Sequence, residues 1–281
     1  METSVRYIRR NRSGSPILDT FVDSLSLGEC LDIASGWANS PTPRTICFCN
    51  VHALVTASVR ADLAKAYAEA DLVLPDGAPV AWMLRLLGHR RQKRISGPDF
   101  MWQYCQRANQ IGASVYLYGN RQATLDTLAS RLKGSFPDLQ IAGMMSPPYR
   151  PLTQEEDDAI VETINASGAR VCFVSLGCPK QELWITAHQT RVHTVMLGVG
   201  AAFDYHAGNV RRPPMWVRNS GFEWLCRLFQ DPKRLWKRYL LANSIFAWRA
   251  AAQALDHALN GREADRRAGG ISQPDTSEPE R

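Results

Sequence analysis

The segment DLVLPDG, residues 71–77, places a carboxylate directly after a short apolar run. Residues 72–74 predict a buried strand, Pro75 ends it, and Gly77 permits a tight turn into the next segment. Asp76 is therefore expected on the rim of a sheet, at the carboxyl end of a strand where ligands of such sheets bind.

Polar side chains also follow the ends of other apolar runs. They are Asn50, Gln181 with Glu182, and Asp204. Each of these residue types is common in turns and helix caps, so none of them alone indicates a site. Together with Asp76 they favour a binding site at one edge of a sheet.

Further segments suit anionic or nucleotide ligands. Arg94 in RISGPDF precedes a helix that we expect to start near Pro98, and a guanidinium group there can bind a diphosphate through two hydrogen bonds. The segment VSLGCPKQELW predicts a helix from Lys180 whose free N–H groups attract anions, or a plain strand-to-helix connection. GVGAAFD is an incomplete dinucleotide fingerprint late in the chain, which disfavours a nicotinamide enzyme. Its glycines suit close approach of a nucleotide, with Asp204 near the ribose, or tight strand packing.

A sheet must bring these residues together, and the sequence predicts one. Short β-rich runs alternate with segments of helical period; the runs are RTICFCN, DLVLPDG, SVYLYGN, LQIAGMM, RVCFVSLGCP and HTVMLGVGAAFD. This alternation is typical of an α/β fold, here a Rossmann-like, mostly parallel sheet with helices on both faces. Ligands of such sheets bind beyond the carboxyl ends of the strands.

Composition narrows the class of protein. The 281 residues are 45% hydrophobic and 21% charged, as in soluble globular proteins. The seven cysteines are widely spaced and contain no C-x-x-C pair, which indicates reduced thiols in a cytoplasmic protein. The chain contains no D-x-D motif and no paired histidine ligands, so no metal and no other cofactor is expected. No signal peptide is apparent, and no apolar stretch approaches the ~20 residues of a spanning helix.

The positive charge is concentrated in one segment. Between residues 211 and 250, nine basic residues stand against Glu223 and Asp231 alone, in a chain of net charge +6. The segment is rich in aromatic residues, and Asp231 with Pro232 predicts the start of a long helix toward Leu259. It fits an interfacial helix pair on anionic lipid, a nucleic-acid groove with stacking platforms, or aromatic packing on the sheet domain. The helical spacing and the tryptophans favour lipid.

The motifs in their order resemble a known family. FCNVH, DLVLPDGAPVAW, RISGPDF, YLYGN, SLGCPKQELWI, GVGAAFDYHAGNVRRPP and GFEWLCRLFQDPKRLWKRYL look like the WecG/TagA/CpsF family of bacterial glycosyltransferases, glycosyltransferase family 26, over roughly residues 15–245. The resemblance implies a GT-E-type fold and a UDP-sugar-dependent, inverting hexosyltransferase. Its donor sugar would be glucose, N-acetylmannosamine or its uronic acid. Its acceptor would be a polyprenyl-diphosphate-linked saccharide of bacterial surface polysaccharide or exopolysaccharide biosynthesis.

The resemblance also implies roles for individual residues. Asp76 falls on the proposed catalytic base, and the substrate-binding positions fall on Asn50, Arg94, Gln181 and Asp204. The positions that bind the acceptor or its diphosphate fall on Arg227, Arg234 and Arg238. Many members carry T-x-N where this chain has Phe48-Cys49-Asn50, so a hydroxyl contact near the sugar is missing or replaced.

We therefore expect three parts: a Rossmann-like domain over residues 1–210, a basic aromatic helical appendage over 211–260, and a disordered tail over 261–281. The expected partners are the UDP-sugar donor, the lipid-linked acceptor and an anionic membrane surface, and nucleic acid is not expected. The protein would lie on the inner face of the cytoplasmic membrane as a peripheral protein. A homo-oligomer is also compatible with an apolar patch left bare by a mobile appendage. The alternative is a non-enzymatic module that binds a nucleotide together with a membrane or nucleic acid.

Overall fold

The computed structural model describes residues 12–40, 42–230 and 232–269. Its main sheet has six parallel strands in the order β4-β3-β8-β7-β5-β6. These strands are β3 (Arg44–Cys49), β4 (Leu72–Pro75), β5 (Ser114–Gly119), β6 (Gln140–Met145), β7 (Val171–Ser175) and β8 (Val195–Gly198). All six coincide with the apolar runs of the sequence, and the expected parallel α/β architecture is confirmed.

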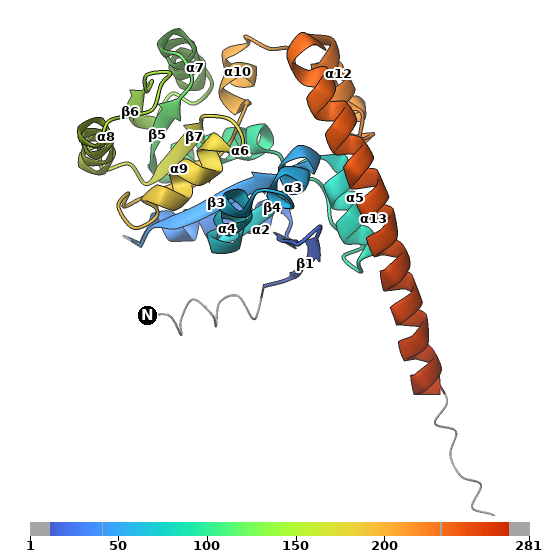
Figure 1. Ribbon diagram of the computed structural model, residues 1–281. Coiled ribbons are helices and arrows are strands. Elements are labelled where there is room, and N and C mark those ends of the chain that lie inside the picture. Colours follow the sequence, from blue (N-terminus) through green and yellow to red (C-terminus); the bar gives the residue numbers. More distant parts are fainter. Residues whose placement is uncertain (1–11, 41, 231, 270–281) are drawn as a thin grey trace, which may run out of the picture.

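Helices cover both faces of this sheet (Figure 1). One face is covered by α2 (Leu27–Ala38), α6 (Gly97–Ile111) and α7 (Gln122–Ser135). The other is covered by α3 (Val51–Ala57), α4 (Ala61–Glu69), α5 (Ala78–Leu86), α8 (Gln154–Ala166) and α9 (Lys180–His188). Two-sided burial explains why the strands are continuous apolar runs rather than alternating ones.

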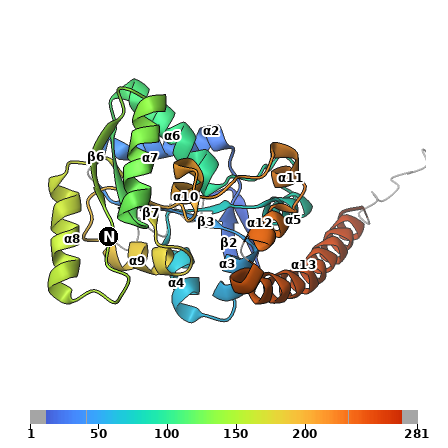
Figure 2. The same ribbon diagram turned by 90° about the horizontal axis from the view of Figure 1, so that it is seen from above.

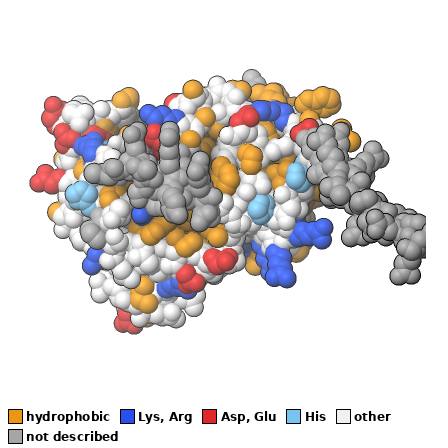
Figure 3. Space-filling model, turned by 90° about the horizontal axis from the view of Figure 1, so that it is seen from below, with side chains coloured by type: hydrophobic (Ala, Val, Ile, Leu, Met, Phe, Trp, Pro, Cys, Tyr) orange, Lys and Arg blue, Asp and Glu red, His pale blue; other side chains and the backbone are white. Residues whose placement is uncertain are grey.

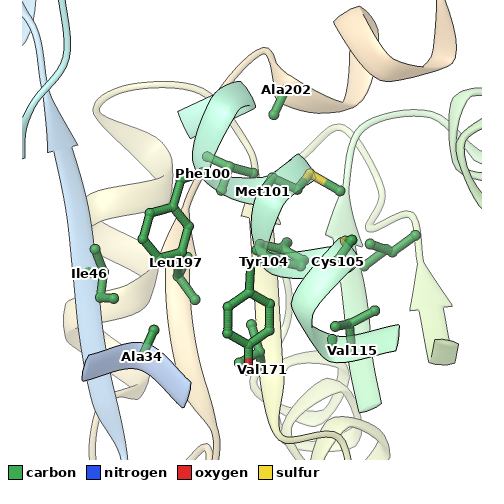
Figure 4. Packing of buried hydrophobic residues seen from close by; sticks show 14 of the residues in the cluster. Ala34, Ile46, Phe100, Met101, Tyr104, Cys105, Val115, Val171, Leu197 and Ala202 are labelled. Atoms are coloured by element: carbon green, nitrogen blue, oxygen red, sulfur yellow. The ribbon is translucent and has the colours of Figure 1, made fainter. Parts of the chain in front are cut away.

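The core under α6 shows how the sheet supports the site. Phe100 and Tyr104 project from α6 onto Ile46, Leu197 and the neighbouring strands, and all of them are buried (Figure 4). Close packing of large side chains fixes the position of α6 and of the loop before it. The residues at the start of α6 are therefore held firmly relative to the strand ends.

A small hairpin extends the fold at the edge strand β4. It consists of β1 (Gly14–Ile17) and β2 (Thr20–Asp23), which pair in antiparallel fashion. The carboxylate of Asp23 is buried, forms an ion pair with Arg12, and accepts a 2.7 Å hydrogen bond from the N–H of Val73 in β4. This contact attaches the hairpin to the sheet edge, a feature that the sequence reasoning did not identify.

The C-terminal part is helical, as predicted. After α10 (Ala202–Ala207) come α11 (Met215–Asn219), α12 (Glu223–Gln230) and α13 (Pro232–Gly269). The helix α13 packs against α3 through Ala242, Phe246 and Ala250 and then runs past the domain (Figure 1). It continues to Gly269, so residues 261–269 of the segment predicted as a disordered tail are helical, and residues 270–281 lie outside the described residues.

The docking of the appendage also involves α5. Figure 2 shows α11 and α12 next to α5, and a contact between Gly221 and Trp82 joins them. Gly221, between α11 and α12, has φ +81°, and a Cβ atom there would stand 2.6 Å from the Trp82 ring of α5. A glycine is thus required both by the backbone conformation and by this close approach.

Candidate active site

The polar residues predicted at strand ends do lie at one edge of the sheet. Asn50 follows β3, Asp76 follows β4, and Asp204 lies on α10 after β8. These three strands are neighbours in the sheet. The N–H of Asp76 donates to the carbonyl of Cys49 at 2.9 Å, which joins the ends of β3 and β4. The topology therefore gathers the residues as the βα alternation indicated.

Asp76 lies in an environment that favours its protonated form. Its side chain is half-buried, and no hydrogen bond or ion pair of its carboxylate occurs among the described residues. Burial, followed by the negative charges of Glu223 and Asp99, raises the pKa of Asp76 to about 7, while Arg94 and Arg212 act in the opposite direction. A carboxylate with this pKa can both accept and hold a proton near neutral pH.

A network of charged groups surrounds Asp76. The guanidinium group of Arg94 is buried and bridges Asp99 at 3.1 Å and Glu223 at 3.4 Å. Two arginines of the C-terminal part also reach Asp99, Arg212 at 2.6 Å and Arg218 at 3.2 Å. The sheet domain and the C-terminal helices thus meet through ion pairs beside the candidate base.

Neutral donors and acceptors complete this network. The hydroxyl of Ser96 donates to Asp99 at 2.7 Å and accepts from Arg212 at 3.0 Å. Asn219 accepts a 3.3 Å hydrogen bond from Arg94. Burial alone would raise the pKa of Asp99, but the hydrogen bonds from Arg212 and Ser96 and the nearby positive charges lower it to about 2.

Besides Arg94, two of the predicted substrate-binding residues have structural partners in this structure. Asn50 caps α3 by accepting from the N–H of Ala53 at 3.1 Å. Gln181 is buried and connects α9 to the segment after β8, since its amide donates to the Gly198 carbonyl at 2.9 Å and its oxygen accepts from the Gly200 N–H at 3.0 Å. Their contacts with substrate stay a prediction.

The remaining predicted residues are Asp204 and three arginines of the C-terminal part. Asp204 is half-buried at the start of α10 and accepts a 3.4 Å hydrogen bond from Asn209. The side chains of Arg227, Arg234 and Arg238 lie outside the described part of the structure. Their role in binding the acceptor or its diphosphate stays a prediction.

The departure at Phe48 has a structural explanation. Phe48 is 5% exposed and packs edge-on against Phe100 with ring centroids 5.5 Å apart. Its ring therefore contributes to the core beneath the site.

The C-terminal helices expose large apolar side chains. Trp216 and Phe229 are about three-quarters exposed and Trp248 is 79% exposed, while Trp236 is half-exposed. The lower face of the molecule, seen in Figure 3, carries acidic and basic side chains interspersed with apolar ones. Over the described residues, no helix combines the length and apolarity needed to cross a membrane.

Sequence reasoning missed four members of the network: Asp99, Arg212, Arg218 and Glu223. The spacing Ser96-x-x-Asp99 before a helix is a signal, but it indicates a helix cap rather than a site. Arg212, Arg218 and Glu223 were visible only as part of a basic segment. Their convergence depends on contacts between residues more than 100 positions apart.

One cavity adjoins the network, and another lies away from it. One of about 280 Å³ adjoins the network and is lined by Asp99, Trp102, Gln103, Tyr205, His206 and Arg212. A larger one of about 820 Å³ lies at the opposite edge of the sheet, near the starts of β5 and β6, away from Asp76. Within the described ranges, no three His, Cys, Asp or Glu side chains are grouped so as to hold a metal ion.

Comparison with known proteins bears on this geometry. The model of the glycosyl transferase WecG/TagA/CpsF family matches residues 15–260. Two similar proteins, from Bacillus subtilis (strain 168) and Bacillus spizizenii (strain ATCC 23059 / NRRL B-14472 / W23), are both named N-acetylglucosaminyldiphosphoundecaprenol N-acetyl-beta-D-mannosaminyltransferase. They are 32% and 33% identical over 171 and 172 residues, or 60% and 61% of this chain. The match spans 64% and 65% of the relatives' own length.

Proposed function

The chain belongs to the WecG/TagA/CpsF family of glycosyl transferases, and from this premise we propose that it is an inverting transferase. It moves a sugar from a UDP-sugar to a saccharide carried on a polyprenyl diphosphate. The two Bacillus relatives are named for transfer of N-acetylmannosamine to N-acetylglucosaminyldiphosphoundecaprenol, which makes UDP-N-acetylmannosamine the first donor to test, before glucose and the uronic acid.

The observation that carries this proposal is Asp76 on the rim, with a pKa of about 7 and a cluster of arginines beside it. In the proposed reaction, the acceptor hydroxyl attacks the anomeric carbon from the face opposite to UDP. A new carbon–oxygen bond forms, the bond to the UDP oxygen breaks with its electron pair staying on UDP, and the hydroxyl proton passes to Asp76. Attack from the opposite face inverts the anomeric configuration.

The charge that develops on the leaving UDP needs stabilisation. Arg94 is buried at the rim and already binds anionic side chains, Asp99 and Glu223. A diphosphate is a chemically similar acceptor for a guanidinium group, since arginine forms charge-assisted, often bidentate, hydrogen bonds with carboxylates and phosphates alike. Fixed positive groups at such a position lower the barrier to departure of the leaving group.

The C-terminal helices suit the lipid carrier of the acceptor. Their exposed tryptophans and phenylalanines, in a segment of high positive charge, match the composition of interfacial helices on anionic lipid. We propose peripheral binding at the inner face of the cytoplasmic membrane, with residues 211–260 as the contacting part. Such binding would place the rim next to a lipid-linked acceptor.

The test is a transfer assay with purified protein, a short-chain polyprenyl-diphosphate N-acetylglucosamine and a set of UDP-sugars. Asp76→Asn is expected to lower turnover by ~10² or more while the fold is kept, which is the scale of lost general-base catalysis. Glu162→Gln, a change at an exposed position on α8, is the matched control. Rates of the Asp76→Asn variant that equal those of wild type would reject the assigned base, and a product with retained anomeric configuration would reject inversion.

A further inference from the structure

One carboxylate holds three arginines that come from different parts of the chain. Asp99, in the first turn of α6, accepts from Arg212 at 2.6 Å and Arg218 at 3.2 Å through one oxygen. Its other oxygen accepts from Arg94 at 3.1 Å and from the Ser96 hydroxyl at 2.7 Å. Both oxygens are thus saturated by protein donors, which leaves Asp99 no evident contact to offer a substrate.

Holding these arginines together opposes their mutual repulsion. Burial, followed by the positive charges of Arg212 and Arg94, lowers the pKa of Arg218. The three guanidinium groups face two carboxylates, Asp99 and Glu223, so this part of the network carries one excess positive charge. Without Asp99 the repulsion between like charges would separate the arginines.

The cluster also has unused hydrogen-bond donors. The Nε atoms of Arg212 and Arg218 are buried, and neither has a hydrogen-bond partner within the described ranges. Buried donors without a partner are rare because they lose their bonds to water. An incoming anion with several oxygens would satisfy them and compensate the excess charge.

We propose that Asp99 is a positioning residue, which holds Arg94, Arg212 and Arg218 as one cluster beside Asp76 so that they can bind an anion of the diphosphate class. It acts through the arginines and does not touch the substrate. The proposal rests on the proposed function, since the leaving group of a UDP-sugar is the diphosphate in question. It adds Arg212 and Arg218 to the ligand-binding side chains.

A simpler role for Asp99 has to be distinguished. Asp99 lies at the third position of α6, and its N–H donates to the capping hydroxyl of Ser96. Loss of a cap lowers stability by about 0.5–2 kcal/mol. A capping role alone predicts that Ser96→Ala and Asp99→Asn act alike on stability and leave UDP binding unchanged.

The decisive variant is Asp99→Asn, which keeps the shape and removes the charge. Titration calorimetry with UDP, in the absence of acceptor, is expected to show at least a tenfold loss of affinity. The direction of the change in UDP affinity distinguishes two roles of Asp99. If Asp99 only reduced the local positive charge, its neutralisation would make UDP bind more tightly. Asp99→Glu keeps the charge and is expected to recover part of the affinity; it also serves if Asp99→Asn fails to fold.

A second readout is the pH dependence of sugar transfer. The charged groups that act on Asp76 are Glu223, Arg94, Asp99 and Arg212. Removing the negative charge of Asp99 by itself lowers the pKa of Asp76, but the separation of Arg94 and Arg212 that the proposal predicts raises it, and Arg94 acts on Asp76 more strongly than Asp99 does. The acidic limb of the profile is therefore expected to move to higher pH in Asp99→Asn, whereas a move to lower pH would show that the arginines stay in place and would overturn the positioning role. In Ser96→Ala, which changes no charge, the limb is expected to stay in place.

The matched control is Asp71→Asn. Asp71 immediately precedes β4, whereas Asp76 follows it, and Asp71 forms a 2.9 Å ion pair with Arg44 at the other edge of the sheet. If wild-type protein transfers sugar and Asp99→Asn matches Asp71→Asn in UDP affinity and in pH profile, the positioning role is overturned and the proposed function stands. If wild-type protein transfers no sugar while Asp99→Asn still loses UDP affinity, the proposed function fails and the clustering role stands.

Discussion

The pH dependence of transfer is the most direct test of the site, and Glu223 is the residue to change. With a pKa of about 7, Asp76 would be ionised to about 9% at pH 6, half at pH 7 and about 90% at pH 8. A base that acts in its ionised form therefore predicts a rise of about tenfold in kcat/KM between pH 6 and pH 8. A carboxylate of ordinary pKa would give a flat profile over this range.

Glu223→Gln changes the profile in a defined direction. After burial, the charge of Glu223 is the largest influence that raises the pKa of Asp76, and Glu223 also neutralises Arg94, which lowers it. Both effects of the substitution lower the pKa of Asp76. A larger fraction is then ionised at pH 6, but the base is intrinsically weaker, so the variant is expected to be faster than wild type at pH 6 and slower above pH 8.

The assay is initial-rate transfer to the lipid-linked acceptor from pH 5.5 to 9, with Glu162→Gln as an exposed control. Values of kcat/KM are compared because they report the ionisation of the free enzyme. Two results would refute the reasoning. One is a wild-type profile that is flat from pH 5.5 to 8, and the other is an acidic limb that moves to higher pH in Glu223→Gln.

Three further predictions concern stability. Phe246→Ala, at the contact of α13 with α3, is expected to lower the free energy of unfolding by about 3 kcal/mol. Trp248→Ala, at a position that is 79% exposed, should change it by no more than about 0.5 kcal/mol. Urea titration measures both variants, and equal losses would contradict the packing of Phe246. Gln181→Ala removes the side-chain partner of the buried Gly198 carbonyl and of the half-buried Gly200 N–H and should cost about 1–3 kcal/mol. Unchanged stability would show that Gln181 has no structural role. Because the pKa of Asp76 is raised to about 7 on folding, its ionisation lowers the stability of the fold between about pH 4 and pH 7. The variant Asp76→Asn should therefore have a higher melting temperature than wild type at pH 8 and an equal one at pH 4. A lower melting temperature of the variant at pH 8 would contradict the raised pKa.

The sequence predicted the sheet well because all of its strands except the edge strand β6 are buried on both faces. Continuous apolar runs such as VCFVS (residues 171–175) and the turn chemistry of Pro75 and Gly77 are local signals, and they place the strand ends. Once the strands are parallel, the rim and the position of Asp76 follow from topology alone. The hairpin over residues 14–23 escaped notice, since Gln253 and the edge of β4 stabilise it from distant parts of the chain.

The arrangement around Asp76 could be predicted only in part. Arg94 was expected near a diphosphate because of its place before a helix, a local feature. The partners of Arg94 were not predicted. The local sequence around Asp99 indicates only a helix N-terminus, and Glu223 is one of two acidic residues in an otherwise basic segment. What decides their role is the docking of α11 and α12 on α5, which depends on shape complementarity at Gly221 and has no periodic signature.

Glu223 belongs to α12, whereas Asp76 belongs to the sheet domain. Since the charge of Glu223 makes a proton bind more firmly to Asp76, the bound proton must in return hold α12 more firmly against the domain, by the same free energy. Release of that proton therefore favours dissociation of α12 from the sheet domain, and dissociation of α12 favours release of the proton. A ligand that displaced α12 would lower the pKa of Asp76 without contacting it.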